Sequence, residues 1–146
     1  MANAHITATE AVNNAIRNFK HAIMAEIECA QIAKVVKYDK KKHVADIQPL
    51  ADTSDGQASA QYLDVPVADN CYLFDEFIEN SKSALQSGGF KLPKKQLMRK
   101  GAIVITVILD RDNDNWSGSK TYMPNTSRLH DANDAVIVAV VGGDYY

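Results

Sequence analysis

The chain has 146 residues, of which 46% are hydrophobic and 23% are charged, and its formal net charge at pH 7 is −2. This length and composition are typical of one globular domain with its own core, while the slight acidic excess disfavours a nucleic-acid binder or a protein held on anionic lipid by charge. No segment approaches the roughly 20 apolar residues of a membrane span, and the N-terminus lacks the basic start and apolar run of a signal peptide, so we expect no stable membrane insertion.

The first predicted element is a helix within residues 1–28. Thr7-Ala8-Thr9-Glu10 matches a capping box, in which the Thr and Glu side chains satisfy free N–H groups at the helix start. An apolar stripe then recurs at helical spacing, formed by Val12, Ile16, Phe19, Ile23 and Ile27. Polar residues occupy the opposite side. We therefore expect this stripe to dock on a barrel or on an adjacent ring of protein.

Strands are predicted next. Residues 31–38 and 43–48 are rich in β-branched residues and flank a polar turn, a pattern typical of a β-hairpin that ends at Pro49. A third strand covers residues 62–67. Pro66 cannot donate a hydrogen bond to a neighbouring strand, so this strand should lie at a sheet edge or bend there.

Residues 70–98 are predicted to be a long, partly helical insertion. Leu73, Phe74, Phe77 and Ile78 have the spacing of a short helix, and Ser87-Gly88-Gly89 would end it. Excursions of this length are usually functional or mobile.

Two later segments, 102–109 and 135–141, are apolar almost throughout. A half-exposed strand alternates apolar with polar residues, so both faces of these strands need cover. The barrel interior covers one face, and a neighbouring subunit is the natural cover for the other. The alternative is that the helix and the insertion suffice. The predicted subunit interface consists of Ile103, Ile105, Val107, Leu109, Val136, Val138 and Val140.

Together these elements predict a mainly β fold, a small OB-like Greek-key barrel preceded by a helix. The expected organisation is an N-terminal helix over residues 1–28, a barrel domain over 29–142 with its insertion at 70–98, and a short tail over 143–146.

Asp110, Asp112 and Asp114 place oxygens at alternate positions, as at the start of a calcium-binding loop. An EF-hand loop then requires Gly and Glu at positions that are here Asn115 and Thr121. A solvated turn after a buried strand is the favoured interpretation, and no metal is expected.

His130-Asp131 and the nearby Ser127 include the residue types of a hydrolase triad. Ser127 lacks the sharp turn that exposes a catalytic serine, so we predict a hydrogen-bonding structural role for His130, no catalytic residue and no cofactor. Cys29 and Cys71 match neither a disulfide framework nor a zinc site and are expected to be packed as small hydrophobic residues.

An alternative function is an OB-fold binding module for single-stranded nucleic acid or an oligosaccharide. Such a site needs a basic groove with aromatic stacking platforms. Tyr38, Tyr62 and Trp116 are candidates for stacking, but the basic spots 40–42, 94–95 and 99–100 are separated along the chain. Trp116 is interpreted instead as a packing anchor whose ring N–H finds a partner.

Five segments, in order, resemble the N-terminal OB-fold domain of phage membrane-puncturing central spike proteins. They are Asp46–Leu50, Val65–Val67, Lys100-Gly101, Asp112–Trp116, and the stretch from Arg128 to Val136, and the motif residues in the last two are Trp116, Arg128, His130, Asp131 and Asp134. The resemblance implies a homotrimeric, non-enzymatic spike or hub on the axis of a contractile-tail baseplate, in contact with hub and tail-tube proteins. It implies a virion protein assembled in the host cytoplasm.

Two departures from that family limit the resemblance. Members commonly continue into a β-helix and a pointed tip with iron-binding histidines, whereas this sequence ends at residues 142–146 without a His-x-His pair. The puncturing tip and its metal are therefore not implied, and we expect a separate tip protein or a blunt spike. The family usually has a shorter link where this chain has residues 70–97, so that insertion and the N-terminal helix are the expected contacts with other baseplate proteins.

Overall fold

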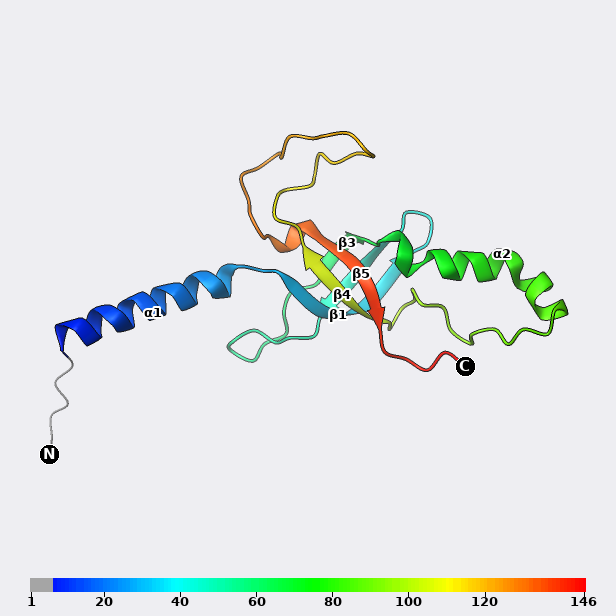
Figure 1. Ribbon diagram of the computed structural model, residues 1–146, viewed down its shortest axis with the longest axis horizontal. Coiled ribbons are helices and arrows are strands. Elements are labelled where there is room, and N and C mark those ends of the chain that lie inside the picture. The colour runs from blue at the N-terminus through cyan, green and yellow to red at the C-terminus, as the bar shows by residue number, and fades with distance from the viewer. Residues whose placement is uncertain (1–6) are drawn as a thin grey trace, which may run out of the picture.

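The computed structural model describes residues 7–146 and has a mainly β architecture, a five-stranded antiparallel sheet curled into a half-barrel, with two α-helices that extend from it (Figure 1). The strands are β1 (Ala30–Asp39), β2 (Val44–Pro49), β3 (Tyr62–Pro66), β4 (Ile103–Ile108) and β5 (Ala135–Val141). The helices are α1 (Ala8–Glu26) and α2 (Leu73–Ser87), and two short 3-10 helices are η1 (Asp69–Cys71) and η2 (Ala132–Asp134).

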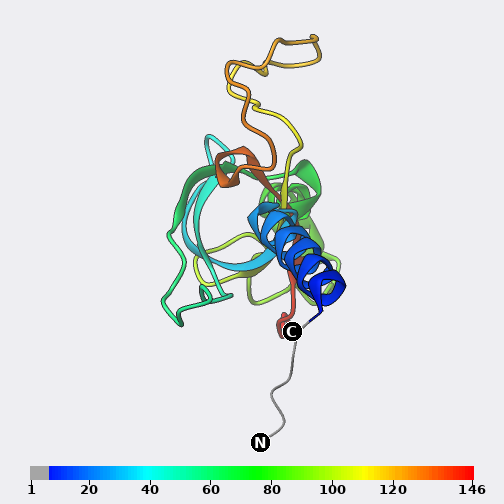
Figure 2. The same ribbon diagram turned by 90° about the vertical axis from the view of Figure 1, so that its left-hand side faces the viewer.

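The sheet has the strand order β3-β2-β1-β4-β5, and every neighbouring pair is antiparallel. Curling brings its two edges toward each other. Beyond the end of β3, Val67 forms an isolated parallel bridge with Ile137 of β5, and the Ala68 N–H donates to the Ile137 carbonyl over 2.9 Å. The curl is visible along the molecule in Figure 2.

The predicted β1–β2 hairpin is confirmed, and its turn is held by the side chain of Asp39. One carboxylate oxygen accepts hydrogen bonds from the N–H groups of Lys41 at 2.9 Å and Lys42 at 3.2 Å. These bonds hold the pKa of Asp39 below its usual value. β3 is the edge strand in the order of the sheet, as Pro66 requires.

The core lies inside the curl of the sheet and is made by alternate residues of its strands. In β2 and β4 every second residue is buried, as expected when one face of a strand packs inward. Val35, Ile47, Val104 and Ile137 are almost completely buried, and Met98 joins them from the chain segment before β4. The buried Thr106 hydroxyl donates to the Gln31 carbonyl over 3.3 Å.

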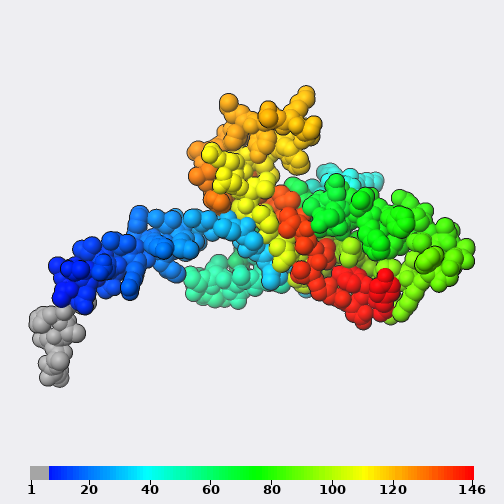
Figure 3. Space-filling view, in the orientation of Figure 1, coloured from blue at the N-terminus to red at the C-terminus, as the bar shows by residue number. Residues whose placement is uncertain are grey.

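The capping box predicted for α1 is confirmed. The Thr7 hydroxyl accepts from the Glu10 N–H over 3.2 Å, and a Glu10 carboxylate oxygen accepts from the Thr7 N–H over 2.8 Å. The helix projects away from the sheet (Figure 3), and none of its residues is buried. It therefore covers neither β4 nor β5 of its own chain. The part of the predicted N-terminal segment at residues 1–6 lies outside the described residues.

The 70–98 insertion contains α2, which continues to Ser87 and is longer than the predicted short helix. The return segment is tied to α2 by Asp75, whose carboxylate is largely buried and accepts from the N–H groups of Leu97 at 2.7 Å and Met98 at 2.8 Å. Because Met98 belongs to the core, this contact joins the insertion to the sheet.

Candidate functional site

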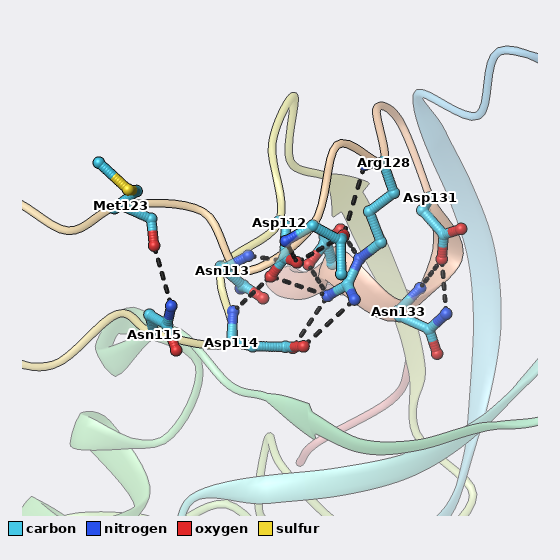
Figure 4. A network of polar contacts seen from close by, with 10 residues as sticks. Asp112, Asn113, Asp114, Asn115, Met123, Arg128, Asp131 and Asn133 are labelled. Atoms are coloured by element: carbon cyan, nitrogen blue, oxygen red, sulfur yellow. Dashed lines mark hydrogen bonds and ion pairs between the residues drawn. The ribbon is translucent and has the colours of Figure 1, made fainter.

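The chain between β4 and η2 forms a long loop that projects from one end of the sheet (Figure 1). Its two ends are joined by a network of ion pairs centred on Arg128 (Figure 4). Asp112 follows β4, and Asp134 directly precedes β5; both side chains are fully buried. Two carboxylates are therefore buried at the base of the loop, while Asp114 remains exposed.

Arg128 contacts three carboxylates. Its Nε and Nη2 atoms each donate over 2.8 Å to a different oxygen of Asp134. Nη1 and Nη2 donate to the two oxygens of Asp114 over 3.2 and 2.9 Å, and Nη2 lies 3.2 Å from Asp112 Oδ1. A planar guanidinium suits such two-pronged contacts, which fix geometry as well as charge.

The two buried carboxylates also accept hydrogen bonds from the loop. Asp112 Oδ2 accepts from the Thr126 N–H at 2.7 Å and from its hydroxyl at 2.6 Å, and Oδ1 accepts from the Asp114 N–H at 2.9 Å. Asp134 Oδ1 accepts from the Asn113 N–H at 3.0 Å. The cost of burying these charges is thereby offset by specific partners.

The electrostatics of the network follow from these contacts. The hydrogen bond from the Thr126 hydroxyl is the main reason that the pKa of Asp112 is lowered, and the pKa of Asp134 is lowered mainly by the hydrogen bonds from Arg128. The pKa of Arg128 is raised, first by Asp134 and then by Asp114. Asp112, Asp134 and Arg128 are therefore ionised at neutral pH, and their contacts make them one structural unit.

The three carboxylates of the cluster surround the guanidinium of Arg128. Asp112, Asp114 and Asp134 each have an oxygen within 4.8 Å of the others, but Arg128 already supplies the positive charge between them. The predicted solvated turn is wrong for Asp112, which is buried because the loop folds back over it.

The residues considered for a hydrolase triad do not form one. His130 Nε2 lies 3.0 Å from Asp110 Oδ1, whereas Asp131 accepts from the Asn133 N–H over 2.9 Å and caps η2. His130 has a φ of 48°, in the left-handed region, and its Nδ1 is buried with no partner among the described residues. His130 and Asp131 thus lie at a corner of the loop and have different partners: His130 contacts Asp110, and Asp131 caps η2.

Trp116 is not the packing anchor that the sequence predicts. Its ring N–H does find a partner, the Gly118 carbonyl at 2.9 Å, but its side chain is 55% exposed on the loop. Tyr122 and Met123, from the same loop, are also exposed. The loop turns back on itself at this point, so Trp116 has no core to reach.

The residues of the predicted subunit interface lie on β4, on β5 and at Leu109, which follows β4. Ile103, Ile105 and Val107 alternate with buried residues and lie on the outer face of β4, half-buried beside one another. Val107 lies opposite Val136, and Ile105 lies opposite Ala139. Leu109 and Val138 are half-buried as well. The outer face of β4 and β5 is thus apolar, as the sequence indicates.

Val140 is a correction to that prediction. The pairing of β4 and β5 shifts between Ile105 and Thr106, and beyond this irregularity Val140 lies opposite the buried Val104. Val140 packs against the core cluster, so Ala139 and Val141 occupy the outer positions. A bulge of this kind reverses which residues face outward.

The outer face is not covered by the chain's own helices. Within residues 7–146, α2 contacts η1, and no extended contact joins either helix to β4 or β5. The stripe predicted on α1 is exposed, with Ile16 60% and Phe19 69% accessible. The insertion does contact β5 within one chain, through η1 and through the Asn70 side chain, which donates to the Val138 carbonyl over 3.0 Å, whereas α1 covers neither strand.

No protein-family model matches this chain, and the comparison with curated proteins found no match. Neither helix in the described part has the length and apolar character needed to cross a bilayer. Cys71 is buried as predicted, whereas Cys29 is exposed at the start of β1.

Sequence reasoning selected Arg128 and Asp134 but missed their partners. Thr126 and Asp112 are separated by 14 residues and meet only because the loop returns to its base. Asp75 was also missed, and its position on the otherwise exposed helix α2 gave no spacing that marks it as buried. Only the tertiary fold brings these groups together.

Proposed function

We propose that this chain is a non-enzymatic structural component of a phage-like tail baseplate, a homotrimeric spike or hub protein on the tail axis. It closes or extends the tube and contacts hub and tail-tube proteins. The observation that carries the proposal is the apolar, half-buried outer face of β4 and β5, with which neither α1 nor α2 makes an extended contact within residues 7–146. Contiguous apolar surface of this kind marks a site of protein association.

The fold supports an OB-like barrel as the basis of this role. β1 pairs with β2 and β4, β2 pairs with β3, and the Val67–Ile137 bridge brings β3 beside β5. These neighbours agree with a five-stranded, partly open Greek-key barrel. A curled, well-packed sheet suits a part that transmits axial load better than loops do.

The segments that resemble the spike family fall on strands of this fold or next to them. Asp46–Pro49 is in β2, Val65–Val67 ends β3, and Gly101 precedes β4. The last two segments, after β4 and before β5, are joined by the contacts of Arg128 with Asp114 and Asp134. Physical contact between two of the motifs supports treating them as one unit.

The oligomeric state is the direct test. Sedimentation equilibrium or native mass spectrometry at micromolar concentration is expected to give three chain masses. Ile105→Asp places a charge on the outer face of β4 and is expected to shift the mass toward one chain without loss of the β signal in circular dichroism. A wild-type protein that stays monomeric at this concentration would contradict the proposal.

Location in a particle is the second test. Antibody labelling of purified tailed particles that contain this chain is expected to mark the distal end of the tail, on its axis. Label on the capsid or along the tail shaft would be incompatible with a spike or hub.

Binding of single-stranded nucleic acid is not expected. The hydroxyl of Tyr62 accepts from Gln31 Nε2 over 2.8 Å, and Tyr38 packs against the core, so neither presents a free stacking platform. Fluorescence anisotropy with labelled oligonucleotides at low salt should show no change. A salt-sensitive rise would favour the binding-module alternative.

A further inference from the structure

α1 is a helix without a partner in its own chain. Its 19 residues include no buried one, and Val12, Ile16, Phe19 and Ile23 are between 43% and 69% exposed. Helices in proteins owe most of their stability to packing of an apolar face, and an isolated helix of this size is marginal in water. We therefore expect the apolar face of α1 to pack against a binding partner, because the helix is marginal without one.

The spacing of the stripe indicates what kind of surface the partner presents. Val12 and Phe19 are seven residues apart, as are Ile16 and Ile23, and a repeat of seven residues over two turns is the period of helices that wind around one another. In heptad terms Ile16 and Ile23 occupy position a, and Val12 and Phe19 occupy position d.

The residues beside the stripe favour other copies of the same helix. Ala8, Ala15 and Ala22 recur every seven residues at position g, where small side chains allow helices to approach closely. Asn13 and Lys20 occupy position e. In a parallel bundle of identical helices position e faces position g of the next helix, so Lys20 faces alanines, while Glu26, at the next position d, ends the apolar run of the stripe.

The connection to the sheet sets the direction of the helix. Only residues 27–29 separate α1 from β1, and the carbonyl of Cys29 accepts from the Ile108 N–H over 2.8 Å, so the connection is anchored at the end of β4. α1 extends away from that point (Figures 1 and 2). Around a common axis, identical anchors make all copies of the helix parallel.

We propose that the α1 helices of different copies pack together through the Val12–Ile23 stripe as a parallel bundle on the axis of the assembly. This inference rests on the proposed homotrimer and adds the helix as a second, independent interface. Because association of the sheets holds the helices at high effective concentration, even a short bundle forms.

Cysteine cross-linking tests the inference in the full chain. In a Cys29→Ser background, Ile16→Cys puts a thiol on the stripe, and Asn14→Cys puts a matched thiol on the opposite side of the helix. Both positions are exposed in the single chain, so neither substitution disturbs the core. Under mild oxidation Ile16→Cys is expected to form disulfide-linked dimers at least tenfold faster than Asn14→Cys.

The outcomes separate the inference from the function on which it rests. A trimeric mass with equal, slow cross-linking of the two variants would overturn the helix bundle and leave the proposed hub in place. A monomeric mass would overturn both. Ile23→Cys provides a second stripe position, one heptad later, and is expected to behave as Ile16→Cys does.

Discussion

Arg128 and Asp134 form a two-pronged ion pair, in which Nε and Nη2 of the guanidinium each lie 2.8 Å from a separate carboxylate oxygen. Asp134 is buried at the start of β5, whereas Arg128 lies near the end of the loop that follows β4. The pair therefore joins a long surface loop to a central part of the fold. Loops of this length are usually functional or disordered, whereas this one is anchored at its base and carries the exposed aromatic residues Trp116 and Tyr122.

Replacing the guanidinium tests how much the network stabilises the fold. Arg128→Gln leaves the carboxylates of Asp112 and Asp134 buried without their cation, so the melting temperature is expected to fall by several degrees. Arg128→Lys should recover only part of this loss, because an ammonium cannot contact two oxygens of Asp134 at once. Thermal unfolding followed by circular dichroism measures the effect.

Arg111→Gln is the matched control for that substitution. Arg111 is exposed, and its Nε lies 3.7 Å from Asp110, so its loss should change the melting temperature little. Equal effects at the two positions would show that the Arg128 network contributes nothing beyond a surface ion pair.

Stability should also depend on acid pH. The pKa values of Asp112 and Asp134 are lowered in the folded protein. A lowered pKa means that the unfolded chain binds protons first, so the stabilisation is fully present above the unfolded value of about 4 and is lost as pH falls through the folded values. Urea midpoints are expected to be constant from pH 7 to about 5 and to drop below about pH 4.

The variant Asp134→Asn isolates the contribution of one carboxylate. It should unfold at lower urea than the wild type at pH 7, and its midpoint should change less between pH 5 and pH 3. An unchanged slope would assign the acid sensitivity to other carboxylates, such as Asp39, whose pKa is also lowered.

Local patterns explain which parts of the fold the sequence predicts. The capping box of Thr7 and Glu10 and the hairpin turn at Asp39 depend on neighbours a few residues apart, and both are confirmed. The buried state of Asp112 depends on Thr126 and Arg128, which arrive from the far end of a loop. No local period marks such a residue, so a carboxylate after an apolar strand was predicted to be solvated.

Asp75 provides a test of how the insertion is held. Asp75→Ala leaves the N–H groups of Leu97 and Met98 without their acceptor, and each unsatisfied buried group costs about 1–3 kcal/mol. The return segment should loosen, and trypsin should cleave faster after Lys94 or Lys95. Limited proteolysis with mass spectrometry locates the cuts.

Glu79→Ala serves as the comparison for Asp75→Ala, because Glu79 lies one turn further along α2 and contacts only exposed Lys40 and the Gln96 side chain. Its cleavage rate should stay close to that of the wild type. If both variants are cleaved at equal rates, Asp75 does not control the order of the segment.

The sequence alone does not show which residues of β5 face the core and which face outward. The apolar run from Ala135 to Val141 contains no polar residue, so its sequence does not say which side chains point inward. The shift in pairing opposite Ile105 and Thr106 sends Val140 to the core, whereas continuous alternation from Val136 places it outside. Only the register of β5 against β4 shows that the Val140 side chain points to the core.

A pair of substitutions separates the inner from the outer positions. Val140→Lys puts an ammonium against the core cluster beside Val104 and is expected to destabilise the monomer fold by several kcal/mol, because an unpaired charge is then buried. Ile105→Lys puts the same group on the outer face, where the lysine stem lies along its neighbours and the charge reaches water. Ile105→Lys should lower the free energy of unfolding by about 1 kcal/mol or less, while the mass of the assembled protein should fall.

Urea unfolding at low concentration, combined with sedimentation at high concentration, measures the two effects separately. Strong destabilisation by Ile105→Lys at low concentration, with none by Val140→Lys, would reverse the assignment of the two faces and remove the basis for an interface on the outer side of β4.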